Sequence, residues 1–142
     1  MTSPEVERQV KRYHGLSRRY IDNAMVEVAC GRWKPAEDLL WGSVVAAVKA
    51  VAWSRREPLH DNTEVEQYTR SLGQEMKDRR IRDAFNRLSG YATMFDRLYD
   101  SPRENTRRLV MDVEEIASAV QRLWRLLPSA EEDPEPEEPF GR

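Results

Sequence analysis

Residues 39–53 read LLWGSVVAAVKAVAW, a run that is apolar on nearly every side of a helix. The preceding KPAED at 34–38 places a proline and two acids in a first helical turn, which is typical of a helix start. The helix has to end before Pro58, because the residue before a proline is disfavoured in the helical conformation. A helix without a polar stripe is stable when other helices surround it. The sequence therefore predicts a buried central helix.

The segments on either side show amphipathic helical patterns. Ser3-Pro4-Glu5 is a helix start, Asp61 and Asn62 are candidate caps, and Ser101-Pro102-Arg103-Glu104 reads as a capping box. Apolar residues recur every three or four positions after each start, and Gly73 falls inside one such segment. No segment reads as a strand, so we expect an all-α antiparallel bundle of about five helices. The expected helices lie at about 4–31, 34–57, 62–78, 79–99 and 102–127.

The chain divides into one helical domain and an acidic tail. Residues 1–127 suit a single core, whereas residues 128–142 are rich in proline and almost devoid of apolar side chains. Residues 131–138 hold six carboxylates and no cation, so the first 128 residues carry a small net positive charge. We expect the tail to be flexible unless it meets a partner.

Composition restricts the function classes. The 23 Lys and Arg nearly balance the 25 Asp and Glu, so the net charge gives no unaided attraction to nucleic acid. The single cysteine, Cys30, excludes an internal disulfide and a Cys-rich zinc site, and we interpret it as a small core residue. No apolar run approaches the 18 residues of a membrane span, and the amino terminus lacks a secretory signal pattern. We expect a cytoplasmic protein that does not contact membranes.

The turn after the central helix is the first candidate site. Arg55, Arg56 and His60 lie close together in sequence, and Asp61 is placed to orient the imidazole. Two arginines beside a histidine suit phosphate binding and proton transfer. Alternatively, the arginines cap the carbonyl end of the helix and His60 is a turn residue bonded to the backbone.

A second candidate is a basic cluster that begins at Arg79 and Arg80 and suits RNA or an acidic partner. Carboxylates interrupt it, which also fits a solvated face with local ion pairs. Its other members are Arg82, Arg87, Arg103, Arg107 and Arg108.

The remaining polar and aromatic residues favour structural roles. The basic residues between Arg8 and Arg19 follow the outer face of the first helix, and the four tryptophans suit core packing better than base stacking. The chain has two histidines, no Glu-x-x-His pairs on facing helices and no glycine-rich phosphate loop, so we expect neither a metal nor a cofactor.

The order of features from Cys30 to Met76 resembles the HEPN domains, the higher eukaryote and prokaryote nucleotide-binding helical bundles. The resemblance rests on Gly31-Arg32-Trp33, on Trp41-Gly42-Ser43 followed by AVKAVA at 47–52, and on Pro58-Leu59-His60-Asp61. The pattern looks most similar to the archaeal PaREP-type subgroup. It covers most of residues 15–127.

This resemblance implies two kinds of function. Some HEPN proteins are metal-independent ribonucleases with four to six residues between an arginine and a histidine, and Arg55 with His60 meets that spacing. However, the pair lies earlier in the chain than in those ribonucleases, and Pro58 forbids a continuous helix between its members. His60 instead resembles the turn histidine of non-nuclease members. We therefore favour a non-catalytic bundle that binds a nucleotide, RNA or a partner protein, with the toxin-like ribonuclease as the alternative.

The resemblance also implies partners. HEPN-like bundles commonly form homodimers, and some pair with a nucleotidyltransferase in toxin–antitoxin systems. A third possibility is a structural adaptor whose acidic tail, residues 131–138, docks on a basic surface of another protein.

Overall fold

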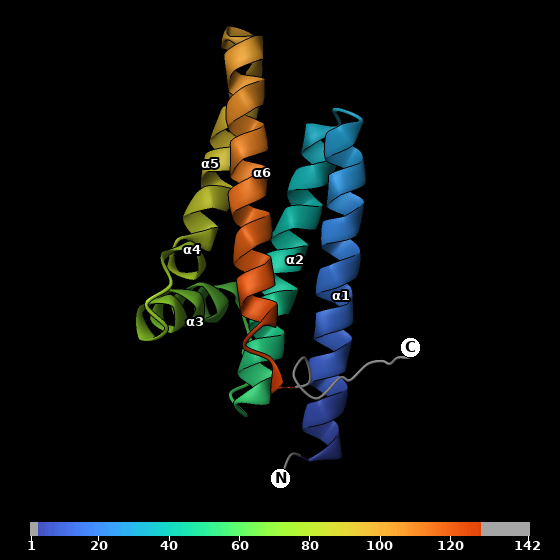
Figure 1. The fold of residues 1–142 in the computed structure, drawn as a ribbon, viewed down its shortest axis with the longest axis vertical. Coiled ribbons are helices and arrows are strands. Elements are labelled where there is room, and N and C mark those ends of the chain that lie inside the picture. The colour runs from blue at the N-terminus through green and yellow to red at the C-terminus, as the bar shows by residue number, and fades with distance from the viewer. Residues whose placement is uncertain (1–2, 129–142) are drawn as a thin grey trace, which may run out of the picture.

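The computed structural model describes residues 3–128 of the 142-residue chain. All regular structure in this part of the chain is helical, as predicted (Figure 1). The predicted acidic tail lies outside the described residues, apart from Pro128. The elements are α1 (Pro4–Ala29), α2 (Trp33–Ser54), α3 (Asn62–Glu75), α4 (Arg79–Arg82), α5 (Ala84–Asp96), the 3-10 helix η1 (Leu98–Asp100) and α6 (Pro102–Trp124).

Two antiparallel helix pairs form the bundle. Helices α1 and α2 form one pair, and α5 and α6 form the other, with α6 also packed along α2 (Figure 1). Helix α3 lies across one end, where it contacts α4 and the carboxyl-terminal part of the bundle's central helix (Figure 1). The bundle is therefore two hairpins and one crossing helix.

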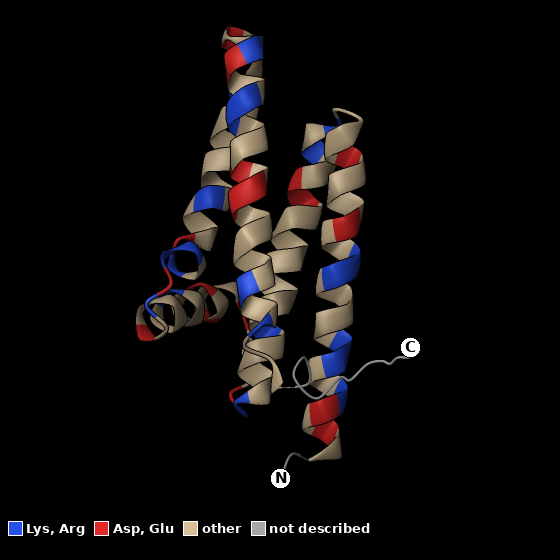
Figure 2. Ribbon diagram, in the orientation of Figure 1, with Lys and Arg blue, Asp and Glu red and all other residues tan. Residues whose placement is uncertain are grey.

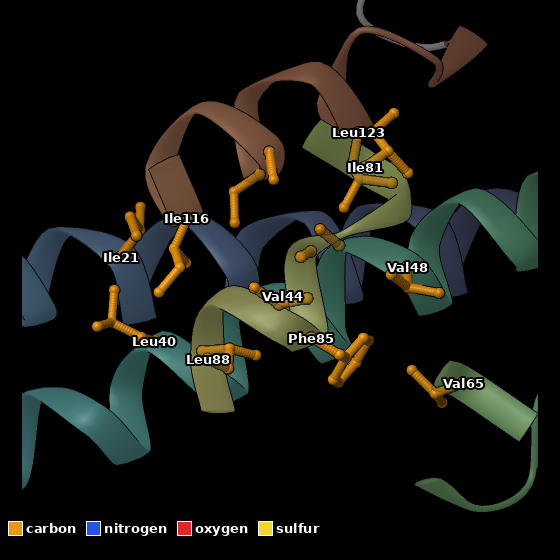
Figure 3. Close-up of a cluster of buried hydrophobic side chains, with 14 of the residues drawn as sticks. Ile21, Leu40, Val44, Val48, Val65, Ile81, Phe85, Leu88, Ile116 and Leu123 are labelled. Atoms are coloured by element: carbon orange, nitrogen blue, oxygen red, sulfur yellow. The ribbon is translucent and has the colours of Figure 1, made fainter. Parts of the chain in front are cut away.

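The predicted central helix is buried. Leu40, Val44 and Val48 have no exposed surface, and Val51 is almost completely covered. They pack in one cluster with side chains from α1, α3, α4, α5 and α6 (Figure 3). The apolar run at residues 39–53 thus organises the core, as its lack of a polar stripe predicts.

Side-chain capping hydrogen bonds form at two of the three expected caps. The Ser3 hydroxyl accepts a hydrogen bond from Val6 N at 3.1 Å, and Asp61 Oδ1 accepts one from Glu64 N at 2.9 Å. The predicted capping box at Ser101 is wrong, because its side chain makes no capping hydrogen bond. Glu104 instead forms an ion pair with Arg108. Proline at the first position still starts α6 where the sequence indicates.

Three helices end in the same left-handed turn. Gly31, Arg56 and Lys77 have φ values of 71°, 61° and 54°. After each of them the next backbone N–H donates to a carbonyl five residues earlier, for example from Asp78 to Gly73 at 2.8 Å. This is the Schellman arrangement, in which the left-handed residue is usually glycine. The turn at Lys77 explains why α3 ends at Glu75, before the predicted Asp78.

The predicted continuous helix over 79–99 is wrong, because the chain breaks it twice. Asp83 separates α4 from α5, and the last part tightens into η1. Helix α4 packs on α3 and α6, whereas α5 packs on α2 and α6. A straight helix cannot follow both directions, so tertiary packing prevails over local propensity here.

Gly73 permits the contact between α3 and α4. A Cβ atom at this position would overlap the backbone of Arg82. The sequence showed only the cost of a glycine inside a helix, about 1 kcal/mol relative to alanine. The close approach of the two backbones explains why a glycine occupies this position despite that cost.

Ser17 and Ser43 join the first hairpin through buried hydrogen bonds. The hydroxyl of Ser17 donates to the Ser43 carbonyl at 2.9 Å, and the hydroxyl of Ser43 donates to the Ser17 carbonyl at 2.8 Å. Trp124 Nε1 on α6 donates to the Ser17 hydroxyl, also at 2.9 Å. These contacts fix α1, α2 and the end of α6 relative to one another.

Cys30 is exposed at the end of α1, so its interpretation as a core residue is wrong. It follows the last residue of the helix, where the chain turns away from the core through Gly31. None of the helices among residues 3–128 is long and apolar enough to cross a membrane.

Candidate functional site

The end of α2 places Arg55 and Arg56 in a capping turn. Arg55 is the carboxyl cap, and Arg56 takes the left-handed conformation. Backbone N–H groups of Arg56 and Glu57 donate to Trp53 and Ala52 carbonyls, each at 2.9 Å. The alternative interpretation of the two arginines as helix-end residues therefore agrees with their backbone positions.

His60 and Asp61 start helix α3. Asp61 Oδ1 accepts from Glu64 N, and Glu64 Oε1 accepts from His60 N at 2.6 Å. These reciprocal bonds satisfy free amide groups at the helix start. The Asp61 carboxylate thus caps the helix, and no hydrogen bond within residues 3–128 joins it to the exposed imidazole of His60.

Arg55 points to the other end of α3. Its guanidinium forms an ion pair with Glu75 at 3.0 Å. Nearby, the buried Tyr68 hydroxyl has no hydrogen-bond partner within the described chain. Burial raises the pKa of Tyr68, an effect that the charge of Arg55 opposes. No hydrogen bond or ion pair in the described chain links Arg55 to His60.

The hollow beside this turn does not suit an anion. It has a volume of 340 Å³, and among residues 3–128 its only charged lining residues are Glu57 and Glu64. Two carboxylates repel a phosphate group. Of the two predicted sites, the turn is therefore the electrostatically less suitable for a phosphate ligand.

The second predicted site forms a pocket of 450 Å³, which we call the arginine pocket. Asp78 starts α4 by accepting hydrogen bonds from the backbone N–H groups of Arg80 and Ile81. The break after this short helix then turns the chain, so that residues of α4 and α5 face α6. The pocket is lined by Arg79, Arg80, Asp83, Arg87 and Glu115.

Ion pairs satisfy two of the three arginines in the pocket. Arg80 contacts Glu115 at 3.3 Å, and Arg87 contacts Asp112 at 3.8 Å. The guanidinium of Arg79 makes no hydrogen bond or ion pair within residues 3–128. Three guanidinium groups and two carboxylates line the pocket, and Asp112 lies beside Arg87 as a third carboxylate, so Arg79 is the lining cation without an ion pair in the described chain.

The carboxylates around the pocket differ in environment. The hydrogen bond from Arg82 lowers the pKa of Asp83, and Arg79 and Arg87 add to this effect. Burial raises the pKa of Asp112, which Arg87 opposes. The ionised form of Asp83 is therefore stabilised by its arginine neighbours, whereas burial makes the ionised form of Asp112 less favourable.

The arginine pocket continues as a groove between α5 and α6. An adjoining hollow of 490 Å³ shares Arg87 and Glu115 with it, and Met94 and Met111 add apolar surface. Arg108 also lines this hollow, whereas Arg103 and Arg107 line none of the hollows described above. The structure thus brings together Arg79, Arg80, Arg87 and Arg108 along one groove, and separates them from Arg55, Arg56 and His60 in the turn.

Sequence reasoning missed Glu115, Met94 and Met111. Asp112 and Glu115 lie three residues apart, so they share one face of α6. That spacing signals a common face, but only the packing of α5 against α6 shows which arginines they meet.

The tryptophans serve the core, as predicted. Trp41 packs edge-on against Phe85, with ring centroids 5.2 Å apart, and Trp124 donates to Ser17. Trp33 and Trp53 are half-buried and also pack against the core cluster.

Within the described part of the chain, no three His, Cys, Asp or Glu residues form a group that could hold a metal ion. Comparison with family models, curated proteins and solved structures found no match. The site is therefore interpreted from its own geometry, and the HEPN resemblance stays a prediction.

Proposed function

We propose that this protein is a non-catalytic helical bundle that binds a phosphate-bearing ligand, a nucleotide or single-stranded RNA, in the arginine pocket. One observation carries the proposal: three guanidinium groups line a 450 Å³ pocket that holds two carboxylates. A planar guanidinium with its fork of N–H donors matches phosphate oxygens.

Arg79 is the expected first contact. It is exposed and forms no ion pair within residues 3–128, although its charge acts on Asp83 at longer range, so binding a phosphate breaks no existing ion pair of Arg79. Arg80 and Arg87 would each have to share their charge with Glu115 or Asp112. The adjoining apolar surface of Met94 and Met111 suits a base ring beside the phosphate.

The lining favours binding over catalysis. No imidazole, thiol or hydroxyl lines the pocket among the described residues. Proton transfer in phosphodiester cleavage by a metal-independent ribonuclease is suited to histidine. His60 belongs to the separate turn between α2 and α3, so we expect no cleavage in the pocket.

The test uses fluorescence polarisation with the full chain and two probes, a labelled 20-nucleotide single-stranded RNA and a fluorescent ATP analogue. We expect Arg79→Ala to weaken binding about threefold to tenfold. For the RNA, the slope of log binding constant against log salt concentration should become shallower by about 0.7, the value for one phosphate contact on a single strand. Arg103→Ala removes the same charge from an exposed position outside the pocket and serves as the matched control.

The two probes separate the sources of phosphate. Binding of the ATP analogue alone assigns a nucleotide ligand, and binding of the RNA alone assigns a nucleic acid. Equal affinities for wild type, Arg79→Ala and Arg103→Ala would overturn the pocket as the binding site. A denaturing gel of the same RNA checks the non-catalytic part, since cleavage that His60→Ala abolishes would favour the ribonuclease.

The homodimer and the nucleotidyltransferase-type partner are expectations from the HEPN resemblance. Sedimentation equilibrium at micromolar concentration tests the dimer, and co-purification from the native host tests the partner. A monomer would remove any composite cleft formed by two copies.

A further inference from the structure

The outer face of α1 carries a strip of cations that the proposed pocket does not use. Between residues 8 and 19 the chain has five Lys or Arg and no carboxylate. At 3.6 residues per turn they fall within an arc of about 120°, opposite the buried side of the helix. We call this strip the α1 basic face; it consists of Arg8, Lys11, Arg12, Arg18 and Arg19.

Most of these cations lack an ionic partner. Arg8 pairs with Glu5, but the other four are exposed and form no ion pair within residues 3–128. Arg18 lies over the Trp124 ring at 5.7 Å, and Arg12 lies over the Tyr13 ring at 5.0 Å. Figure 2 shows Lys and Arg recurring along this half of α1. Four unpaired positive charges on one helix face attract a polyanion.

Near its carboxyl end, the described chain contacts α1 at the edge between the buried side of the helix and the α1 basic face, where Arg18 lies over the Trp124 ring. Trp124 contacts α1 at Ser17 and His14, with its ring centroid 5.5 Å from that of His14. Helix α6 runs antiparallel to α1 (Figure 1), so residues 125–128 continue in the direction of the amino-terminal half of α1. The remaining chain, residues 129–142, therefore begins within reach of the α1 basic face.

That remaining chain has the complementary charge. Residues 131–138 contain six carboxylates and no cation. Extended, these eight residues span up to about 28 Å, which covers the distance of about 17 Å from Arg8 to Arg19 along the helix.

We infer that the acidic segment 131–138 docks on the α1 basic face of its own chain. Each exposed ion pair contributes only about 0 to 1 kcal/mol. However, several pairs act together, and tethering through Pro128 holds the segment at an effective concentration in the millimolar range. The docked segment would screen this face from other polyanions, which leaves the arginine pocket as the accessible cationic site.

The test places a nitroxide spin label on the segment in the full chain. Cys30→Ser removes the exposed native thiol, and Pro136→Cys provides the attachment site. In the amide NMR spectrum, paramagnetic broadening by the label should lower the signal intensities of residues 8–19 about twofold or more in 10 mM salt, where the Debye length is about 30 Å. The intensities should recover in 1 M salt, where the Debye length is about 3 Å.

Charge reversal identifies the surface. Lys11→Glu combined with Arg19→Glu should abolish the broadening, whereas Arg103→Glu combined with Arg107→Glu should retain it. The two pairs make the same change in net charge at exposed positions of α1 and α6. The amide spectrum of each variant checks that it is folded, so a lost effect is not mistaken for unfolding.

Three outcomes would overturn the inference. The first is that the signals of residues 8–19 are not broadened at low salt, and the second is that the broadening persists in the Lys11→Glu, Arg19→Glu variant. The third is that broadening occurs only when spin-labelled chains are mixed with separate isotope-labelled chains. The last outcome would assign the segment to a second copy. None of these results depends on ligand binding in the arginine pocket, so the two proposals fail independently.

Discussion

Ser17 shows how one small polar residue joins three helices. Its hydroxyl accepts from Trp124 Nε1 and donates to the Ser43 carbonyl, and the residue has no exposed surface. A buried polar group that loses its partner costs more than the net value of its hydrogen bond, because it also loses water. The site is therefore sensitive to removal of a single oxygen atom.

We expect Ser17→Ala to lower the free energy of unfolding by about 1 to 3 kcal/mol, because Trp124 N–H loses its acceptor. Urea unfolding measures the loss, and Ser71→Ala, at an exposed serine, should change stability by less than about 0.5 kcal/mol. Trp124→Phe removes the donor, so the double variant should cost less than the two single changes together. Strict additivity would contradict the proposed coupling.

His14 gives the bundle a sensitivity to acid. Burial lowers the pKa of this imidazole below its ordinary value of 6.5, and the neighbouring charge of Arg18 lowers it further. The folded protein thus binds this proton more weakly than the unfolded chain does. The resulting stability is complete above pH 6.5 and is lost as the pH falls through and below that value.

We therefore expect the wild type to lose more stability between pH 7.5 and pH 5.5 than His14→Gln does, since the variant lacks this proton-binding group. Urea unfolding at both values measures the difference. His60→Gln removes an exposed imidazole and serves as the control. Equal pH dependence of the wild type and His14→Gln would show that His14 does not carry the effect.

At the scale of the elements, two glycines inside helices have opposite roles. Gly15 lies on the outer face of α1, and a Cβ atom there would have no neighbour within 4 Å. Gly73 lies where the backbones of α3 and α4 meet, and a Cβ atom would overlap Arg82. The same substitution at the two positions separates helix propensity from packing.

Gly15→Ala should raise the free energy of unfolding by about 0.5 to 1 kcal/mol, because alanine loses less backbone entropy on folding. Gly73→Ala should lower it by about 1 to 3 kcal/mol, because α3 and α4 have to move apart. Urea unfolding of both variants provides the comparison. Changes of the same sign would show that the contact between α3 and α4 is not as close as described.

The elements also show what can be read from a sequence. Ser3 and Asp61 act as caps because their signals are local, and the lack of a polar stripe alone identifies α2 as the buried helix. The break at Asp83 is not local, because it depends on α4 following α3 while α5 follows α2. The left-handed turns at Arg56 and Lys77 could not be predicted from the sequence either, because neither residue is a glycine.

At the scale of the whole molecule, the same limit applies to the candidate site. Arginine spacing predicted a basic cluster, but Arg80 and Glu115 are 35 residues apart and meet only because α4 packs against α6. In the turn, adjacency in sequence suggested a joint role for Arg55 and His60, yet their bonds lead to Glu75 and Glu64. Proximity along the chain was a poor guide to which side chains cooperate.

The way α3 is attached suggests that the bundle does not open as one unit. Helix α3 crosses the end of the bundle (Figure 1), and its buried residues are Val65, Thr69, Leu72 and Gly73. Helices α1 and α2 form the most extensive contact between elements of the described chain, and α2 holds the centre of the core. Regions with few buried contacts open at lower free energy than the core.

We therefore expect α3 amides to exchange hydrogen faster than amides at the middle of α2. Leu72→Ala deletes a nearly fully buried side chain of α3, typically costing about 2 to 5 kcal/mol, and should speed α3 exchange at least about tenfold. Leu40→Ala makes the same deletion in α2, where it should speed exchange of α2 and leave that of α3 unchanged, because α3 opens without α2. If both variants speed both helices equally, the bundle unfolds as a single cooperative unit.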